Sequence, residues 1–167
     1  MKIDSLEDVL IHELNDLYSA EDQLVEALPL MAEAASSSEL RNAFRQHLEE
    51  TRDHRDRIQS IFGELGKRRT GVECEGMKAL ISEGEKIIKS RGDAAAKDAA
   101  LIGAAQRVEH YEIAAYGTAR TLAGELGLSE AENLLDQTLD EEAQADKLLT
   151  KIATGGMFRA GVNQAAT

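Results

Sequence analysis

Signals that end a helix are scarce in this sequence, and this scarcity limits the folds that it can adopt. One proline stands among 167 residues, and aromatic residues make up only 4% of the chain. β-Sandwiches and barrels favour aromatic and β-branched residues and need many turns, so both are disfavoured. The long segments between the few breaks instead predict helices, and an all-α fold is expected.

The existing turn signals divide the chain into five helices. Their expected ranges are 5–35, 39–65, 76–90, 94–126 and 129–153. Two long helices, one short helix and two more long helices are typical of a four-helix bundle with one long crossover, which here carries the short helix. We expect a single bundle domain over residues 1–154 and a flexible C-terminal tail over residues 155–167.

Individual residues mark the ends and breaks of these helices. Ser5, Ser38 and Ser129 are the expected N-caps of the first, second and fifth helices. Pro29 lies inside the first helix, where a proline removes one backbone hydrogen bond. We therefore expect Pro29 to kink this helix or to split off its last turns.

The charge of the chain limits its partners and its location. The formal net charge is −12, which disfavours contact with nucleic acids and with anionic membranes. No run of apolar residues reaches the length of a membrane span, and the first ten residues contain acidic groups that do not suit a signal peptide. Cys74 has no partner for an internal disulfide, which fits a reducing compartment. We expect a cytoplasmic protein.

The inner face of each long helix carries acidic or histidine residues where apolar ones are expected. These faces were read at alternating spacings of four and three residues. The exceptions are Glu21 in the first helix, His47 and His54 in the second with Glu50 at the edge of the face, Glu109 and Glu112 in the fourth, and Glu142 in the fifth with Asp146 one turn later.

These polar residues stand at matching heights in the two predicted hairpins. The separation between Glu21 and His54 equals that between Glu109 and Glu142. Several buried carboxylates repel one another unless positive charge lies among them, and the inner faces offer no lysine or arginine nearby. Two metal ions, iron or manganese, would supply that charge, with carboxylates of the fourth and fifth helices as bridges.

Other roles for the polar residues stay open at this stage. The acidic layer can instead be protonated or salt-bridged, which would make the protein a metal-free helical interaction scaffold without catalytic activity. His47 fits a hydrogen-bonded core histidine better than a ligand. Tyr116 fits a packing residue, or a hydrogen-bond donor to a metal ligand. Cys74 lies between acidic residues, which discourage thiolate formation, so it is not proposed as a nucleophile.

Four stretches of the sequence resemble the bacterial YciE/YciF-type ferritin-like proteins. They are DLYSAEDQL (16–24), HLEET (47–51), AAQRVEHYEIAAYGT (104–118) and TLDEEAQAD (138–146). The resemblance covers residues 3–153 and implies a ferritin-like bundle related to rubrerythrin, a place in bacterial stress responses, and a homodimer. It implies metal ligands at Glu21, Glu50, His54, Glu109, Glu112, Glu142 and Asp146.

The chain departs from the usual ferritin-like ligand pattern at two places. Glu50 and His54 are four positions apart instead of three, and Asp146 stands where a histidine is usual. A site with so little imidazole should stabilise oxidised iron or manganese and disfavour turnover with oxygen. These departures put oxygen chemistry in doubt more than metal binding.

Two metal-dependent functions follow from this pattern. One is a di-iron oxidoreductase that removes peroxide or oxygen with electrons from an unidentified donor. The other is a non-enzymatic metal-binding stress protein. The chain has no CxxC pair for a rubredoxin-like electron donor site, which favours the second over a rubrerythrin-type peroxidase.

Overall fold

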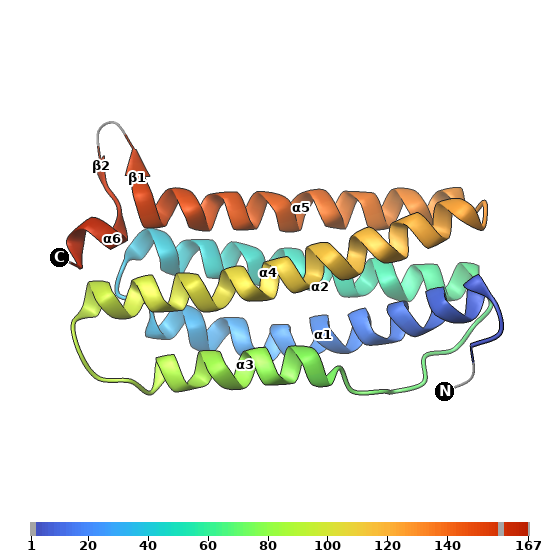
Figure 1. Ribbon diagram of the computed structural model, residues 1–167, viewed down its shortest axis with the longest axis horizontal. Helices are drawn as coiled ribbons and strands as arrows, with labels where there is room; N and C mark the ends of the chain where they lie inside the picture. Colours follow the sequence, from blue (N-terminus) through green and yellow to red (C-terminus); the bar gives the residue numbers. More distant parts are fainter. Residues whose placement is uncertain (1–2, 157–158, 167) are drawn as a thin grey trace.

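Four long helices lie side by side along the long axis of the molecule, and a shorter helix lies beside two of them (Figure 1). The structure is a computed structural model that describes residues 3–156 and 159–166. The helices are α1 (Leu6–Ala34), α2 (Ser38–Glu64), α3 (Glu75–Ile88), α4 (Ala94–Glu125) and α5 (Ser129–Thr154). Helices α1 and α2 form one hairpin, α4 and α5 form the other, and α3 lies in the crossover against α1 and α4. The predicted four-helix bundle is confirmed.

The predicted helix starts agree with the structure to within about a residue. The Ser5 side chain caps α1 by accepting a hydrogen bond from the backbone N–H of Asp8. Ser37, and not Ser38, caps α2. The cap prediction for α5 was wrong. Ser129 is the first residue of the helix, and the N-cap is Leu128, whose side chain forms no capping hydrogen bond.

Helix α1 continues without a break past Pro29, so a split of its last turns, one of the two expected effects, is wrong, and the kink stays a prediction. Proline removes one backbone hydrogen bond, but tertiary packing can hold the remaining turns. Leu28, Met31 and Ala32 are buried on either side of Pro29 and anchor the end of α1 in the core.

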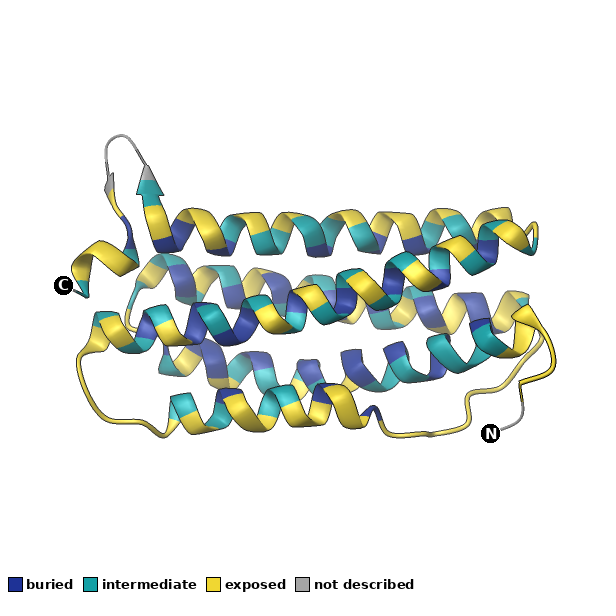
Figure 2. Cartoon of the chain, in the orientation of Figure 1, coloured by how far each residue is buried: buried dark blue, intermediate teal, exposed yellow. Residues whose placement is uncertain are grey.

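The apolar core is divided into two clusters along the bundle. Buried residues follow the inner faces of the long helices (Figure 2). One cluster includes Leu14, Phe62 and Leu135, and the other includes Leu28, Phe44 and Ile152. Buried acidic and histidine residues of α1, α2, α4 and α5 lie where the two clusters meet. The bundle therefore surrounds a polar layer with apolar residues at both ends.

The start of α4 is tied to the first hairpin by one buried carboxylate. Asp98 of α4 accepts hydrogen bonds from the backbone N–H groups of Ser36 and Ser37, at 2.8 and 2.7 Å. Its burial and its two donors fix the α1–α2 turn against the start of α4.

The segment after α5 contains a short antiparallel pair, β1 (Gly155–Gly156) and β2 (Arg159–Ala160), and one helical turn, α6 (Val162–Ala165). Helix α6 lies against α4 and α5. The flexibility expected of this segment stays a prediction. In the described ranges, no helix combines the length and the apolar character needed to cross a bilayer.

Candidate metal centre

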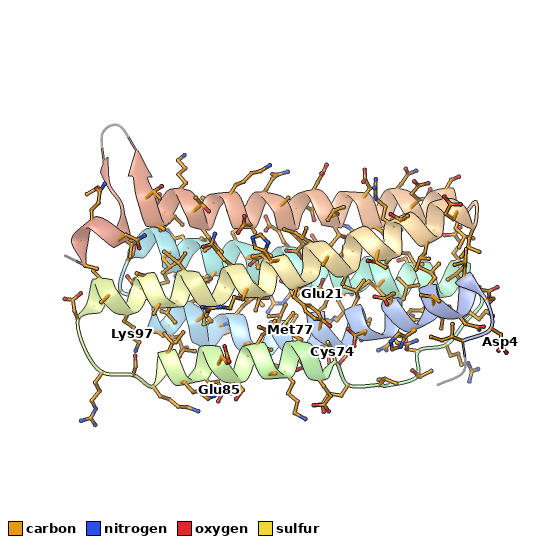
Figure 3. The ribbon with its side chains drawn as sticks, in the orientation of Figure 1. Asp4, Glu21, Cys74, Met77, Glu85 and Lys97 are labelled. Carbon is orange, nitrogen blue, oxygen red and sulfur yellow. The ribbon has the colours of Figure 1, made fainter. Side chains whose placement is uncertain are left out.

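Acidic and histidine side chains from all four long helices converge in the polar layer. Figure 3 labels Glu21 near the middle of the long axis, on α1. The 4,3 spacing places one or two such residues of each helix on its inner face. The buried members are Glu21, His47, His54, Glu109, Glu112 and Glu142. Five of these six are predicted site residues. The sixth is His47, for which the sequence favoured a hydrogen-bonded core histidine over a metal ligand.

Glu142 lies between the two histidines. Its Oε1 atom is 3.0 Å from Nδ1 of His54, and its Oε2 atom is 3.5 Å from Nε2 of His47. The side chain of Glu142 is fully buried, so no bulk water reaches either oxygen. One carboxylate therefore faces an imidazole nitrogen on each side.

The surrounding carboxylates complete two groups that share Glu142. Nδ1 of His54 is 3.6 Å from Glu21, and Nε2 of His47 is 3.5 Å from Glu109. Within each group, one potential ligand atom per residue lies within 4.8 Å of all the others. The groups are Glu21, His54 and Glu142, and His47, Glu109, Glu112 and Glu142. This arrangement suits two neighbouring ions with Glu142 as the bridge.

Most buried polar atoms of this cluster have no hydrogen-bond partner. Both oxygens of Glu112 are unpartnered, as is one oxygen each of Glu21 and Glu109. The oxygens of Glu142 and the ring nitrogens of His54 and His47 that face them form no hydrogen bond to any other polar group. Among the described residues, the one such atom elsewhere is Nε of Arg120. Unsatisfied buried polar groups are rare and costly, and a missing ion is one of their standard explanations. Carboxylate oxygens with two imidazoles are a donor set that fits iron or manganese.

The metal-free cluster has a distinctive pattern of pKa values. Burial raises the pKa of the Glu109 and Glu112 carboxyls well above their usual range. Burial alone would lower the pKa of both histidines, but the neighbouring carboxylates, with Glu142 among them in each case, raise the pKa of His47 to about 10 and that of His54 to about 11. In the absence of a metal ion, these shifts favour protonated histidines among the carboxylates.

Glu141 supports His54 from outside the cluster, and the sequence did not single it out. Its Oε2 atom lies 2.9 Å from Nε2 of His54 and accepts a hydrogen bond from Arg57. Partial burial opposes ionisation, but the hydrogen bond from Arg57 lowers the pKa of Glu141 to about 2. An ionised Glu141 favours a proton on Nε2, so that Nδ1 is the ring nitrogen that faces Glu21 and Glu142.

Glu50 has the corresponding position beside His47. Its Oε2 atom lies 3.4 Å from Nδ1 of His47, on the side away from Glu109 and Glu142. The structure does not bring Glu50 into either group of potential ligands. A cavity of about 210 Å³ between α2, α4 and α5 is lined by Glu50, His47, Glu109 and Glu141. Polar side chains thus lead from the α2–α5 face to the cluster.

Asp146 lies apart from the other predicted site residues. Its Oδ1 atom accepts a hydrogen bond from Gln106 at 2.9 Å and is 3.4 Å from Nε2 of His110. His110 is exposed, so this pair belongs to the surface of the α4–α5 hairpin. The structure does not place Asp146 with the potential ligands.

Two tyrosines extend the hydrogen bonding around the cluster. The hydroxyl of buried Tyr116 donates a short hydrogen bond to Glu21. Tyr111 donates to Asp16 at 2.7 Å, and the thiol of Cys74 donates to the same carboxylate at 3.1 Å. Burial raises the pKa of the Cys74 thiol, in line with its assignment as a non-nucleophile.

Comparison with known proteins places this geometry in a family. The model of a family described as "Domain of unknown function (DUF892)" matches residues 5–167. The chain belongs to the DUF892 family. This DUF892 protein is 45% identical over 166 residues to Protein YciF of Escherichia coli K12, which covers 99% of the chain and all of that relative.

Solved structures agree with this assignment. The crystal structure of the E. coli stress protein YciF matches the DUF892 chain with a TM-score of 0.87 and 46% identity, over 89% of this chain and 94% of that one. YcfI from Rhodopseudomonas palustris matches with a TM-score of 0.87 and 39% identity, over 91% and 97%. A dodecameric thioferritin from Bacteroides fragilis matches with a TM-score of 0.67 and 16% identity, over 88% and 84%, which shows the fold alone. The DUF892 chain is thus a YciF-like protein with a ferritin-like helical bundle.

Proposed function

We propose that this chain is a metal-binding stress protein that holds two iron or manganese ions in its polar layer. The observation that carries the proposal is Glu142, whose two fully buried oxygens face ring nitrogens of His54 at 3.0 Å and of His47 at 3.5 Å and have no other polar partner. Water satisfies such atoms at a protein surface, but these atoms have no access to it. Two cations on either side of Glu142 would satisfy both oxygens and neutralise the carboxylates around them.

The stress role rests on similarity. The E. coli relative is described as a stress protein, and its structure matches that of this chain over most of both molecules. Bound iron or manganese would supply redox chemistry toward peroxide or oxygen. The chain's own contribution is to hold the ligands at fixed positions, to orient His54 through Glu141 and to exclude bulk water with apolar residues on both sides.

Metal content measured on variants tests the proposal. The untagged chain, reconstituted with Fe²⁺ or Mn²⁺ and freed of loose metal, should retain about two ions per chain by plasma mass spectrometry. Glu142→Gln should retain less than one ion, because the shared ligand is lost. Glu125→Gln is the matched control, since Glu125 is exposed on α4. No metal in the reconstituted wild type would contradict the proposal.

A metal-free scaffold is the second candidate, and the same measurement separates the two. Protonated Glu109 and Glu112 with imidazolium at His47 and His54 would compensate the layer without metal. In that case the wild type and Glu142→Gln would both retain only background amounts of metal. We also propose that the protein is cytoplasmic and forms a homodimer. Light scattering of the purified chain measures its molar mass and so tests the dimer. An electron donor is expected only if the ions turn over.

A further inference from the structure

A second cavity, of about 360 Å³, lies between α1, α3 and α4. Helix α3 lies beside both α1 and α4 and forms the outer wall (Figure 1). Most of the lining side chains are aliphatic or methionine, among them Leu28, Met31, Ile81 and Val108. Ligand pockets in proteins are typically about 300 to 1,000 Å³ and mostly apolar. The cavity has the size and the wall chemistry of a site for one small molecule.

The inner end of this cavity reaches the candidate metal centre. Glu109 of α4 lines it, and the same residue lines the polar cavity between α2, α4 and α5. Glu109 is 2% exposed, and its Oε2 atom has no hydrogen-bond partner. The buried Glu109 carboxyl group therefore stands between a polar cavity and an apolar one, with its Oε2 atom 3.5 Å from Nε2 of His47.

The ionisable residues that line the apolar cavity are all acidic, and the two cations beside them are already engaged: Arg55 pairs with Asp22 at 2.9 Å and Lys89 with Glu85 at 2.8 Å. Asp22, Glu26, Glu85 and Glu109 are among its lining residues, and the described lining includes no lysine or arginine. A carboxylate or phosphate on a ligand would lose its water there and find no free cation to compensate its charge. The charge therefore selects against fatty acids and phosphorylated molecules and favours an uncharged ligand.

We propose that this cavity binds an uncharged aliphatic molecule of the size of a medium-chain alcohol, with its hydroxyl toward Glu109. The apolar walls would bury the chain, which stabilises binding by about 0.8 kcal/mol for each buried methylene. The Glu109 carboxyl group at the inner end, which can donate or accept a hydrogen bond when protonated, gives the hydroxyl a partner and sets the direction of the ligand. The apolar walls need no metal ion, but Glu109 also belongs to one of the groups of potential metal ligands, so the proposal is tested on the metal-free chain.

Gly84 provides a way to fill the cavity without touching the metal centre. This residue of α3 lines the cavity, and a Cβ atom added there would lie 3.9 Å from Sδ of Met31, which is an ordinary contact. Leucine is also a better helix former than glycine, so Gly84→Leu should fold. Ala27→Leu fills the cavity from the α1 wall as a second variant. Gly63→Leu is the control, because Gly63 lies on α2 with no neighbour within 4 Å.

The test is a fluorescence titration of the full chain with N-phenyl-1-naphthylamine, an uncharged apolar probe, followed by displacement with 1-decanol or decanoate. It is run on the chelator-treated chain. We expect one saturable site per chain that 1-decanol empties, with decanoate weaker by about tenfold or more. Gly84→Leu and Ala27→Leu should each lower the affinity for the probe and for 1-decanol by about tenfold or more. Gly63→Leu should bind both as the wild type does.

Three results would overturn the proposal. The first is no saturable binding in the wild type. The second is decanoate binding as tightly as 1-decanol. The third is that both filled variants bind the probe and 1-decanol as tightly as the wild type does. If light scattering also shows that their molar mass has changed, the cavity is a contact between copies of the chain. Because the titration is run without metal, its failure is separate from failure of metal binding.

Discussion

Nε2 of His54 lies 2.9 Å from Oε2 of Glu141, and this contact turns the other ring nitrogen toward Glu142, 3.0 Å away. Carboxylates that hold the far nitrogen of a histidine are common behind metal ligands, because they fix the tautomer and the ring orientation. Glu141 is itself held by Arg57 from α2. The support of His54 therefore depends on contacts between α2 and α5.

Glu141→Gln should weaken metal binding without removing a ligand. The amide cannot supply the negative charge that favours a proton on Nε2, so we expect about a 10- to 100-fold loss of affinity. Competition with a coloured chelator measures this change. Asp136→Asn is the control, since Asp136 is exposed on the same helix. Equal affinities in the two variants would show that Glu141 does not orient His54.

Glu112→Met should stabilise the metal-free chain while lowering its metal content. Both oxygens of Glu112 are buried and unpartnered, and an apolar side chain of similar size removes that cost. We expect a gain of about 1 to 4 kcal/mol in the free energy of unfolding, measured in urea with chelator present. Glu125→Met, at an exposed position of α4, should change it by no more than about 0.5 kcal/mol. A destabilised Glu112→Met chain would indicate that Glu112 is satisfied in the absence of metal.

The metal-free chain should become less stable as the pH rises from about 5.5 to about 8.5. Burial raises the pKa of Glu109 and Glu112, and nearby carboxylates raise the pKa of His47 to about 10 and that of His54 to about 11. The folded chain then binds more protons than the unfolded chain over this interval, so the free energy of unfolding falls with pH. The histidine contribution is complete below the ordinary histidine pKa and is lost as the pH passes the raised values.

Bound metal should reverse this trend, because the ion displaces the same protons and binds more tightly at higher pH. Thermal melting with chelator and with excess Mn²⁺, at both pH values, measures the two slopes. We expect the melting temperature to fall with pH in chelator and to rise in Mn²⁺. A rise with pH in both conditions would contradict the raised pKa values of the metal-free layer.

Asp98→Ala should destabilise the bundle independently of metal. The carboxylate accepts from two backbone N–H groups of the α1–α2 turn, and both would lose their partner. We expect a loss of about 1 to 3 kcal/mol in urea unfolding, with chelator present. Asp140→Ala, at an exposed position of α5, is the control. Unfolding midpoints that match in the two variants would mean that solvent replaces the Asp98 contacts.

The fold and the centre of the polar layer follow from helical periodicity. Glu21, Glu112 and Glu142 interrupt otherwise apolar faces, and residues at equal distances from a tight turn lie level in a helical hairpin. These two rules need only the position of each residue along its helix. They predict five of the six buried members of the cluster, together with the two hairpins.

The edges of the helix faces could not be predicted in the same way. A residue one position from the inner face lies about 100° around the helix, and its contacts depend on how the neighbouring helix is rotated. Glu50, Glu141 and Asp146 are all at such edges. Glu141 meets His54 and Glu50 meets His47, while Asp146 pairs with Gln106. The one local signal for Glu141 is its place beside Glu142.

Anomalous X-ray diffraction from crystals of the chain reconstituted with iron, collected at the iron absorption edge, tests the central claim most directly. We predict two peaks in the polar layer, about 3.5 to 4 Å apart, with Glu142 between them, His54 beside one and His47 beside the other. Crystals of Glu142→Gln should lose at least one peak. An empty polar layer in the reconstituted wild type, with iron present in the crystallisation solution, would contradict a two-ion centre.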